Sequence, residues 1–355
     1  MKIGLITVYY ANFGSYFQAV ALKDYLEGMG HECLTLNASI RGMKVAKFLC
    51  AAAFGKIAPE ALNKRLEEVN APYRIYRSLA KSIDGLNVTP AFKGLSIQKE
   101  LDCICVGSDE LWSASLEEMG YIPKYFGIGV NKPHFSYATS GASIDFDADL
   151  PWEEMKKGFN GFSSISVRDN KTQEMVKKVC GKNVTRCIDP TLLNPFFIDL
   201  EKASADGYIL IYGVHYSDDD KRKIRSYAKE NKLKIRGISW KHDFLDEFIE
   251  PRSPKEFVEQ FLHASFVVPS TFHGTIFSIL SHTPFASFPA KQKATKIIDL
   301  LELIGLEERN AAAVSDLSDL GPIDWNGVES RLELLRNESS AYLESALETM
   351  REEVA

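Results

Sequence analysis

At 355 residues the chain is longer than one typical domain, and a hydrophobic content of 45% is enough for two cores. Its formal net charge of -6 gives no electrostatic reason to expect a nucleic-acid partner. The six cysteines are scattered through apolar patterns, which is typical of buried free thiols in a reducing compartment. They are Cys33, Cys50, Cys103, Cys105, Cys180 and Cys187.

The amino terminus shows no secretory signal, because Met1 runs directly into a strand-like pattern, and we therefore expect a cytoplasmic protein. The longest apolar stretch, residues 45–58, contains Lys47 and Lys56 and is too short to cross a bilayer. Together with Lys44 it fits an amphipathic helix packed on the protein. The alternative is a peripheral contact at the inner face of the membrane.

The sequence predicts no metal site. Cys103 and Cys105 would share one face of a strand, but no second cluster completes a ligand set. The seven histidines show none of the usual ligand spacings. They are His31, His134, His215, His242, His263, His273 and His282.

The first elements form a βαβ unit. An apolar, β-branched run over residues 2–8 is followed by a small polar loop and then by a helical pattern that ends at Gly30. A second strand pattern covers residues 32–36. This order predicts a parallel, doubly wound sheet. The loop contains one glycine, Gly14, and not the three of a dinucleotide fingerprint, so NAD binding is not favoured.

Three more strand patterns each end in a polar group. Residues 101–106 lead to Ser108 and Asp109, which can bind a sugar or position a base, or else cap a helix with Trp112 in the core. Residues 134–138 lead to Ser140. Residues 163–167 lead to Arg168, which can bind an anion as a planar fork or pair with Asp169 or Asp189 as structure. Residues 41–95 read as helices without a recognisable site.

A proline-punctuated linker over residues 189–195 separates this unit from a second one. Strand and helix patterns then alternate again, and a capping box at Ser253 opens one of the helices. We predict strands at 208–213, 234–238, 266–268 and 284–288, and closing helices at 297–305 and 328–350. The expected domains are 1–195 and 196–327, with the last helix reaching back to the first domain.

The most informative turn follows the strand at 266–268. The strand breaks at Pro269, and a helix opens directly behind His273 and Gly274. Free backbone N–H groups and the helix dipole at such a turn suit a phosphate or a carboxylate, and a histidine there can exchange protons near neutral pH. The alternative is an ordinary histidine that caps or packs the turn.

Ligands of open parallel sheets bind outside the carboxyl ends of the strands. The loops around Asn12, Ser108, Ser140, Arg168 and residues 270–273 all follow a predicted strand. We therefore expect two Rossmann-like doubly wound domains that face a cleft, with these loops forming one site.

With these residues in view, the chain resembles the polysaccharide pyruvyl transferase family along almost its whole length. Seven segments carry the resemblance in the right order: 10–19, 106–112, 135–141, 165–169, 189–193, 270–275 and 298–306. The resemblance implies two domains similar to those of the GT-B glycosyltransferases. It also implies transfer of pyruvate from phosphoenolpyruvate to a saccharide hydroxyl pair as a ketal, in exopolysaccharide, capsule or cell-wall polymer synthesis.

The resemblance also implies that His273 is the catalytic or donor-contacting histidine and that Arg168 holds negative charge of the donor. The reaction needs an acid and a base, and Asp109 or Glu110 is the candidate for the second group. Lys291, Lys293 or Lys296 can add positive charge. The remaining expected substrate-binding residues are Asn12, Gly14, Ser15, Gln18, Ser108, Ser140, Ser270, Thr271, Gly274 and Thr275. No cofactor is expected beside phosphoenolpyruvate, which is the donor substrate.

One position departs from the family pattern. Characterised members carry Arg-Leu-His at the histidine, whereas this chain has Thr271-Phe272-His273, so a guanidinium expected on the donor is missing. Two other functions therefore stay open, a GT-B glycosyltransferase that uses a nucleotide sugar and a non-catalytic carbohydrate-binding subunit. The acceptor sugar, its linkage to a lipid and the oligomeric state are left open.

Overall fold

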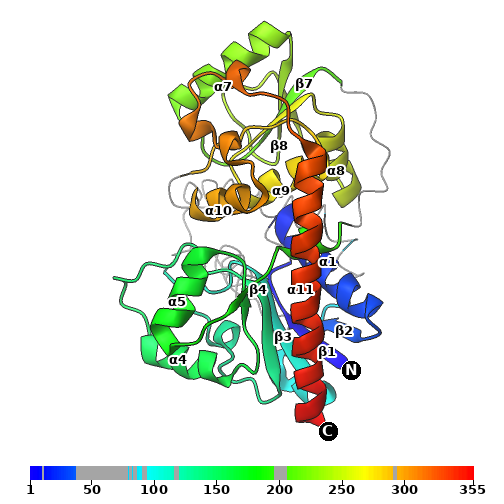
Figure 1. Cartoon of the computed structure of the whole chain (residues 1–355). Helices are drawn as coiled ribbons and strands as arrows, with labels where there is room; N and C mark the ends of the chain where they lie inside the picture. Colours follow the sequence, from blue (N-terminus) through cyan, green and yellow to red (C-terminus); the bar gives the residue numbers. More distant parts are fainter. Residues whose placement is uncertain are drawn as a thin grey trace, which may run out of the picture.

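The computed structural model describes residues 1–9, 12–36, 79, 82, 86–89, 94–115, 120–195, 206–290 and 294–355. The helix expected around residues 45–58, together with Cys50, Lys291 and Lys293, lies outside these residues. The described residues form two parallel sheets with helices packed around them, one sheet in each half of the molecule (Figure 1).

The first sheet has six strands in the order β2-β1-β3-β4-β5-β6, all parallel. The strands are β1 (Lys2–Ile6), β2 (Glu32–Thr35), β3 (Cys103–Asp109), β4 (His134–Thr139), β5 (Ser166–Val167) and β6 (Thr185–Arg186). The α-helices of this half are α1 (Phe13–Gly28), α4 (Trp152–Gly161) and α5 (Asn170–Cys180), with 3-10 helices η2 (Gly94–Glu100) and η3 (Pro123–Phe126). Helix α5 ends at Gly181, which adopts the left-handed conformation common at helix ends.

The second sheet has the order β10-β7-β8-β9 and is also parallel. Its strands are β7 (Tyr208–Tyr212), β8 (Lys234–Ile238), β9 (Glu247–Ile249) and β10 (Phe266–Pro269). The helices are α6 (Pro190–Leu193), α7 (Asp218–Asn231), α8 (Pro254–Leu262), α9 (Phe272–Leu280), α10 (Ala294–Ile304), η5 (Glu307–Arg309), η6 (Ala311–Ala313), η7 (Leu317–Asp319) and α11 (Trp325–Val354).

The segment expected as a strand at 284–288 lies beside β10 but forms only isolated bridges. Phe285 bridges to Val267, and the Phe288 N–H still donates to the Pro269 carbonyl of β10 at 2.8 Å. Ser287 between them faces the other way and exchanges backbone hydrogen bonds with Arg309 and Ala311, so the pairing with β10 is interrupted.

An aromatic contact joins the two halves. Phe13 of α1 stacks on Phe257 of α8 with ring centroids 4.5 Å apart, and Phe17 of α1 meets Phe277 of α9 at 5.0 Å. All four side chains are buried and belong to one continuous core cluster. The amino-terminal helix is therefore held against the second half by apolar packing.

Helix α11 begins beside the second sheet and runs along the first (Figure 1). Its Tyr342 hydroxyl donates to the Ser136 carbonyl at 2.8 Å, and its Ser339 hydroxyl accepts from the Ile188 N–H at 3.1 Å. Near the start of the same helix, the Arg331 side chain donates to the Ile304 carbonyl of α10. Among the described residues, no helix is long and apolar enough to cross a membrane.

Candidate active site

The expected site lies where the carboxyl ends of the two sheets meet. Asp109 ends β3, Arg168 follows β5 directly, and His273 is in the first turn of α9, just after β10. Asp189 caps α6 and accepts the Thr191 N–H at 3.0 Å, so it sits in the connection that leaves the first sheet. Residues from both halves thus reach one region.

A buried carboxylate links the two main candidates. Oδ2 of Asp189 accepts a hydrogen bond from Nη1 of Arg168 at 2.5 Å and lies 3.6 Å from Nε2 of His273. The side chain of Asp189 is fully buried, and those of Arg168 and His273 are 2% and 10% exposed. At 3.6 Å the histidine contact is longer than a hydrogen bond. We call these three residues the Asp189 cluster.

The charges of this cluster support one another. Burial raises the pKa of the Asp189 carboxyl, but the neighbouring His273 and Arg168 outweigh burial and hold its pKa well below the ordinary value. Burial lowers the pKa of the Arg168 guanidinium, whereas Asp189, Asp109 and Asp169 raise it more, so its pKa is above the ordinary value. Asp189 is therefore a carboxylate and Arg168 a cation across the physiological pH range.

The start of α1 touches the histidine. A Cβ added to Gly14 would lie 2.3 Å from Cγ and 2.4 Å from Nδ1 of His273, closer than any real contact. Only glycine therefore lets the first turn of α1 approach the imidazole this closely. Asn12 and Ser15 form the capping box of this helix, with Ser15 N–H donating to Asn12 Oδ1 at 2.9 Å and Asn12 N–H donating to Ser15 Oγ at 3.0 Å.

A second set of polar contacts connects α10 with the first half. Nζ of Lys296 donates to Oε2 of Glu110 at 2.7 Å. Asp299 accepts from the backbone N–H of Asn170 at 2.9 Å and from its side-chain amide at 3.1 Å. Arg186 donates to the Asn170 side chain at 2.8 Å and to the Asp299 carbonyl at 3.0 Å. These contacts fasten the two halves together next to the Asp189 cluster.

A small hollow lies between these groups, with a volume of about 10 Å³. That is close to the space of a single water molecule. Its walls are partly apolar and carry three cationic side chains, and its lining residues are Arg168, Arg186, Ile188, Asp189, Leu192, Phe272, Lys296, Leu300 and Leu303. In this structure the hollow is too small for a substrate.

Several buried donors in this region have no hydrogen-bond partner among the described residues. They are Nε and Nη2 of Arg168, Nε of Arg186 and Nε2 of His273. Nη2 of Arg168 has only a longer ionic contact, at 3.7 Å, with Oδ1 of Asp109. Unpaired buried donors are costly, so they are expected where a ligand supplies the acceptors.

Phe272 holds the guanidinium in place. The Arg168 Cζ atom lies 4.3 Å from the centre of the Phe272 ring, and the Lys296 ammonium lies 5.8 Å from it. Both distances are in the range of cation–π contacts. Phe272, one of the two residues that differ from the family's Arg-Leu-His pattern, thus contacts two of the three cations.

Other expected site residues have structural partners. The Thr271 hydroxyl caps α9 through the Gly274 N–H at 3.1 Å, and the Ser140 hydroxyl donates to Asp169 at 2.6 Å. The hydroxyls of Ser108, Ser270 and Thr275 and the amide of Gln18 are likewise bonded to backbone or neighbouring side chains. Trp112 is fully buried, as expected, but no helix begins at Ser108 or Asp109 in the described residues, so neither acts as a helix cap. These groups shape the turns, whereas the Asp189 cluster carries the charge.

The sequence indicates Asp189 only as a structural partner of Arg168, and it does not indicate Arg186 as a site residue. Arg186 ends the two-residue edge strand β6, where no local pattern distinguishes it from a surface arginine.

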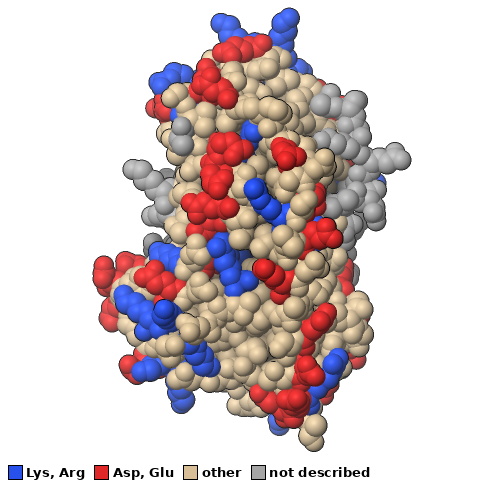
Figure 2. All heavy atoms as spheres, in the orientation of Figure 1, with Lys and Arg blue, Asp and Glu red and all other residues tan. Residues whose placement is uncertain are grey.

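Among the described residues, no group of three or more His, Cys, Asp or Glu side chains could hold a metal ion. Figure 2 shows acidic and basic side chains interspersed over the face seen in Figure 1.

Comparison with known proteins identifies the family. The polysaccharide pyruvyl transferase model matches residues 12–291, most of the chain, so this protein belongs to that family. Search of curated proteins found no match.

Solved structures share the fold at low sequence identity. An α-glucosyltransferase solved with UDP and a 13-mer DNA is 11% identical, with a TM-score of 0.52 over 100% of this chain and 95% of its own. MnaA from S. aureus, solved with UDP, is 12% identical, with a TM-score of 0.52 over 95% of this chain and 91% of its own. The predicted fold class, two Rossmann-like domains similar to GT-B glycosyltransferases, is confirmed.

Proposed function

We propose that the protein transfers pyruvate from phosphoenolpyruvate to two hydroxyls of a saccharide, forming a ketal and releasing phosphate. Membership of the family makes it a transferase that acts on a saccharide. The observation that carries the choice of donor is the Asp189 cluster. It places an imidazole and a guanidinium with unpaired buried donors beside each other, at the carboxyl ends of both sheets.

The charges fit a donor with a carboxylate and a phosphate. The guanidinium missing at position 271 is offset by Arg186 and Lys296, which line the same hollow as Arg168. Planar guanidinium groups bind such anions through paired hydrogen bonds. Lys296 is bonded to Glu110 in this structure, so the donor would have to compete with that carboxylate.

The reaction can be written with these residues. His273 gives a proton to the methylene carbon of phosphoenolpyruvate, which leaves an oxocarbenium-like centre at the carbon that bears the phosphate. One saccharide hydroxyl adds to this centre, phosphate leaves, and the second hydroxyl closes the ketal. Of the two hydroxyl protons, one replaces the proton lost from His273 and the other leaves with phosphate. Asp109, whose carboxylate lies near Arg168, takes the proton from the attacking hydroxyl.

The test is phosphate release from phosphoenolpyruvate in the presence of cell-wall or capsule precursors. We expect His273→Ala to abolish release while the protein stays folded, and Arg168→Ala to raise mainly the KM for phosphoenolpyruvate. Release by His273→Ala at the parent's rate would remove the histidine from the mechanism. An unchanged KM in Arg168→Ala would remove the arginine from the donor site.

A thermal-shift comparison separates this function from the alternatives. A ligand that binds only the folded protein raises its stability, by about 2.7 kcal/mol at a hundred times its Kd. We expect phosphoenolpyruvate to raise the Tm and nucleotide sugars not to do so. The opposite result would favour a glycosyltransferase, and a shift with saccharides alone would favour a carbohydrate-binding subunit. A cytoplasmic location, a lipid-linked acceptor and contact with the membrane surface belong to the same proposal.

A further inference from the structure

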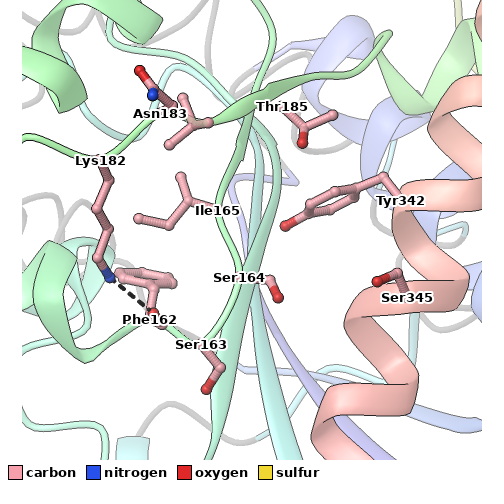
Figure 3. A pocket seen from close by; sticks show the side chains of 10 residues that line it. Phe162, Ser163, Ser164, Ile165, Lys182, Asn183, Thr185, Tyr342 and Ser345 are labelled. Carbon is pink, nitrogen blue, oxygen red and sulfur yellow. Dashed lines mark hydrogen bonds between the residues drawn. The ribbon is translucent and has the colours of Figure 1, made fainter.

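A larger hollow lies at the opposite edge of the first sheet from the Asp189 cluster. It has a volume of about 420 Å³ and is open to solvent along one side. Its walls are residues 162–165, which lead into β5, residues 182–185, which lead into β6, and Tyr342 and Ser345 of α11 (Figure 3). We call it the α11 groove. Its size is in the range of small-molecule sites.

The groove is lined by groups that both donate and accept hydrogen bonds. Figure 3 shows the hydroxyls of Ser163, Ser164, Thr185 and Ser345 and the amide of Asn183 around the opening. Hydroxyl and amide groups match the hydroxyls of a sugar, which have the same double character. A ring of such groups suits a polyhydroxy compound better than an apolar one.

Within the described lining of the groove, no cation is available for an anion. Lys182 is the one charged residue in its lining, and its ammonium already donates to the carbonyls of Phe159 at 3.0 Å and Phe162 at 3.2 Å, with Asn160 at 3.5 Å. These carbonyls are at the carboxyl end of α4, where a cation is favoured by the helix dipole. The cation therefore completes the helix end, and the groove suits an uncharged ligand.

An aromatic side chain is fixed at the wall. The Tyr342 hydroxyl donates to the Ser136 carbonyl at 2.8 Å, and its ring lies 6.4 Å from that of Tyr137. Figure 3 shows the ring projecting from α11 toward the strand side of the groove. A ring held in this way loses little freedom when a sugar places its C–H face against it.

We propose that the α11 groove is a second saccharide-binding site that takes an uncharged stretch of a polysaccharide. Under the proposed function, which this step assumes, it holds the acceptor polymer at a distance from the reacting hydroxyls. Residues 162–165 precede β5 and residues 182–184 precede β6, whereas Arg168 follows β5, so the two sites lie at opposite edges of one sheet. A polymer held at one site is present at the other at a raised effective concentration.

The test uses a variant that fills the groove. Ser345 is exposed on α11, so Ser345→Trp places an indole in the groove without disturbing the core. Leu334→Trp, at another exposed position of the same helix, is the matched control. The probes are maltoheptaose, cellohexaose, chitohexaose and neutral fragments of bacterial capsule polysaccharide, with inorganic phosphate as the anionic probe. Binding is measured by saturation-transfer NMR and calorimetry.

We expect at least one neutral oligosaccharide to bind the parent, the control and His273→Ala alike, and to bind Ser345→Trp at least about tenfold more weakly, a difference of about 1.4 kcal/mol. Equal binding by Ser345→Trp, binding of phosphate in the groove, or no binding by any neutral probe overturns the proposal. Binding is read without turnover, so a failure of the proposed reaction leaves this result intact. Where turnover is seen, Ser345→Trp should raise the KM for a polymeric acceptor but not for a disaccharide acceptor.

Discussion

Replacing Asp189 with asparagine tests whether the buried carboxylate organises the site. The substitution keeps the size of the side chain and a group that can cap α6, so it removes little except the charge. Arg168 and Asp189 form a pair with side-chain exposures of 2% and 0%, 2.5 Å apart. Removing one partner of a buried ion pair costs about 3–5 kcal/mol, because the other charge stays buried without compensation.

The lower end of this range is expected here. Arg168 keeps an ionic contact with Asp109 at 3.7 Å and the ring of Phe272 at 4.3 Å. We therefore expect Asp189→Asn to lower the free energy of unfolding by about 3 kcal/mol. For a domain of about 150–250 residues this corresponds to a fall in Tm of about 6–12 °C.

The stabilising effect of Asp189 should decrease in acid. The folded-state pKa of Asp189 lies below its ordinary value of 3.8, because His273 and Arg168 outweigh the effect of burial. Its stabilising contribution is therefore complete above that ordinary value and is lost as the pH falls through the lower folded pKa. The difference between parent and Asp189→Asn should therefore be larger at neutral pH than in strong acid.

Urea unfolding followed by tryptophan fluorescence at pH 7 and at about pH 3 measures both effects. The control is Asp324→Asn, which changes the exposed N-cap of α11 in the same way and should cost less than about 0.5 kcal/mol. A loss at Asp189→Asn of under about 1 kcal/mol at pH 7, or an equal loss at both pH values, would refute the account of this pair.

Three further outcomes follow from the contacts. Gly14→Ala should lower kcat about a hundredfold, because the added methyl displaces His273. Gly28→Ala, with nothing within 4 Å of the added methyl, should leave turnover unchanged. Steady-state phosphate release compares the two variants, and equal rates would contradict the Gly14 contact. Glu110→Gln and Lys296→Met should show a coupling of about 0.5–3 kcal/mol in a double-mutant cycle of unfolding, and additive losses would mean that their bond does not fasten the halves. Burial raises the thiol pKa of Cys33, Cys103 and Cys187 to about 12. Thiol reagents at pH 8 should therefore modify these three cysteines slowly in the folded protein and rapidly once it is unfolded.

The local elements could be predicted because their signals are local. The strand at 234–238 is correct at both ends, and the helix expected behind Ser253 begins at Pro254, with Ser253 Oγ accepting from the Glu256 N–H. The edge strand β9 at 247–249 was missed, because three half-buried residues show no alternation long enough to detect. The placement of His273 and Arg168 at strand ends followed from the parallel topology, which the structure confirms.

The partners of these residues could not be predicted. Asn170 meets Asp299 across 129 positions of the chain, and Lys296 meets Glu110 across 186. Such pairs depend on how α10 docks on the first half, and docking is set by the packing of whole elements and not by any single segment. Asp189 could be seen in the sequence as a possible partner of Arg168, but its second contact with His273 required both halves in place.

The balance of charge around the hollow ties these points to function. Arg168, Arg186 and Lys296 line it, and each already has an acidic or carbonyl oxygen as a partner. A donor with a phosphate and a carboxylate cannot enter a space of about 10 Å³, and it cannot bind these cations unless some of their present partners withdraw. Asp189 is buried at the connection between the halves and pairs with Arg168, whereas Glu110 pairs with Lys296 of α10. If the donor binds as proposed, Lys296 has to exchange Glu110 for the donor, whereas Arg168 can keep Asp189 and bind through its unpaired Nε and Nη2.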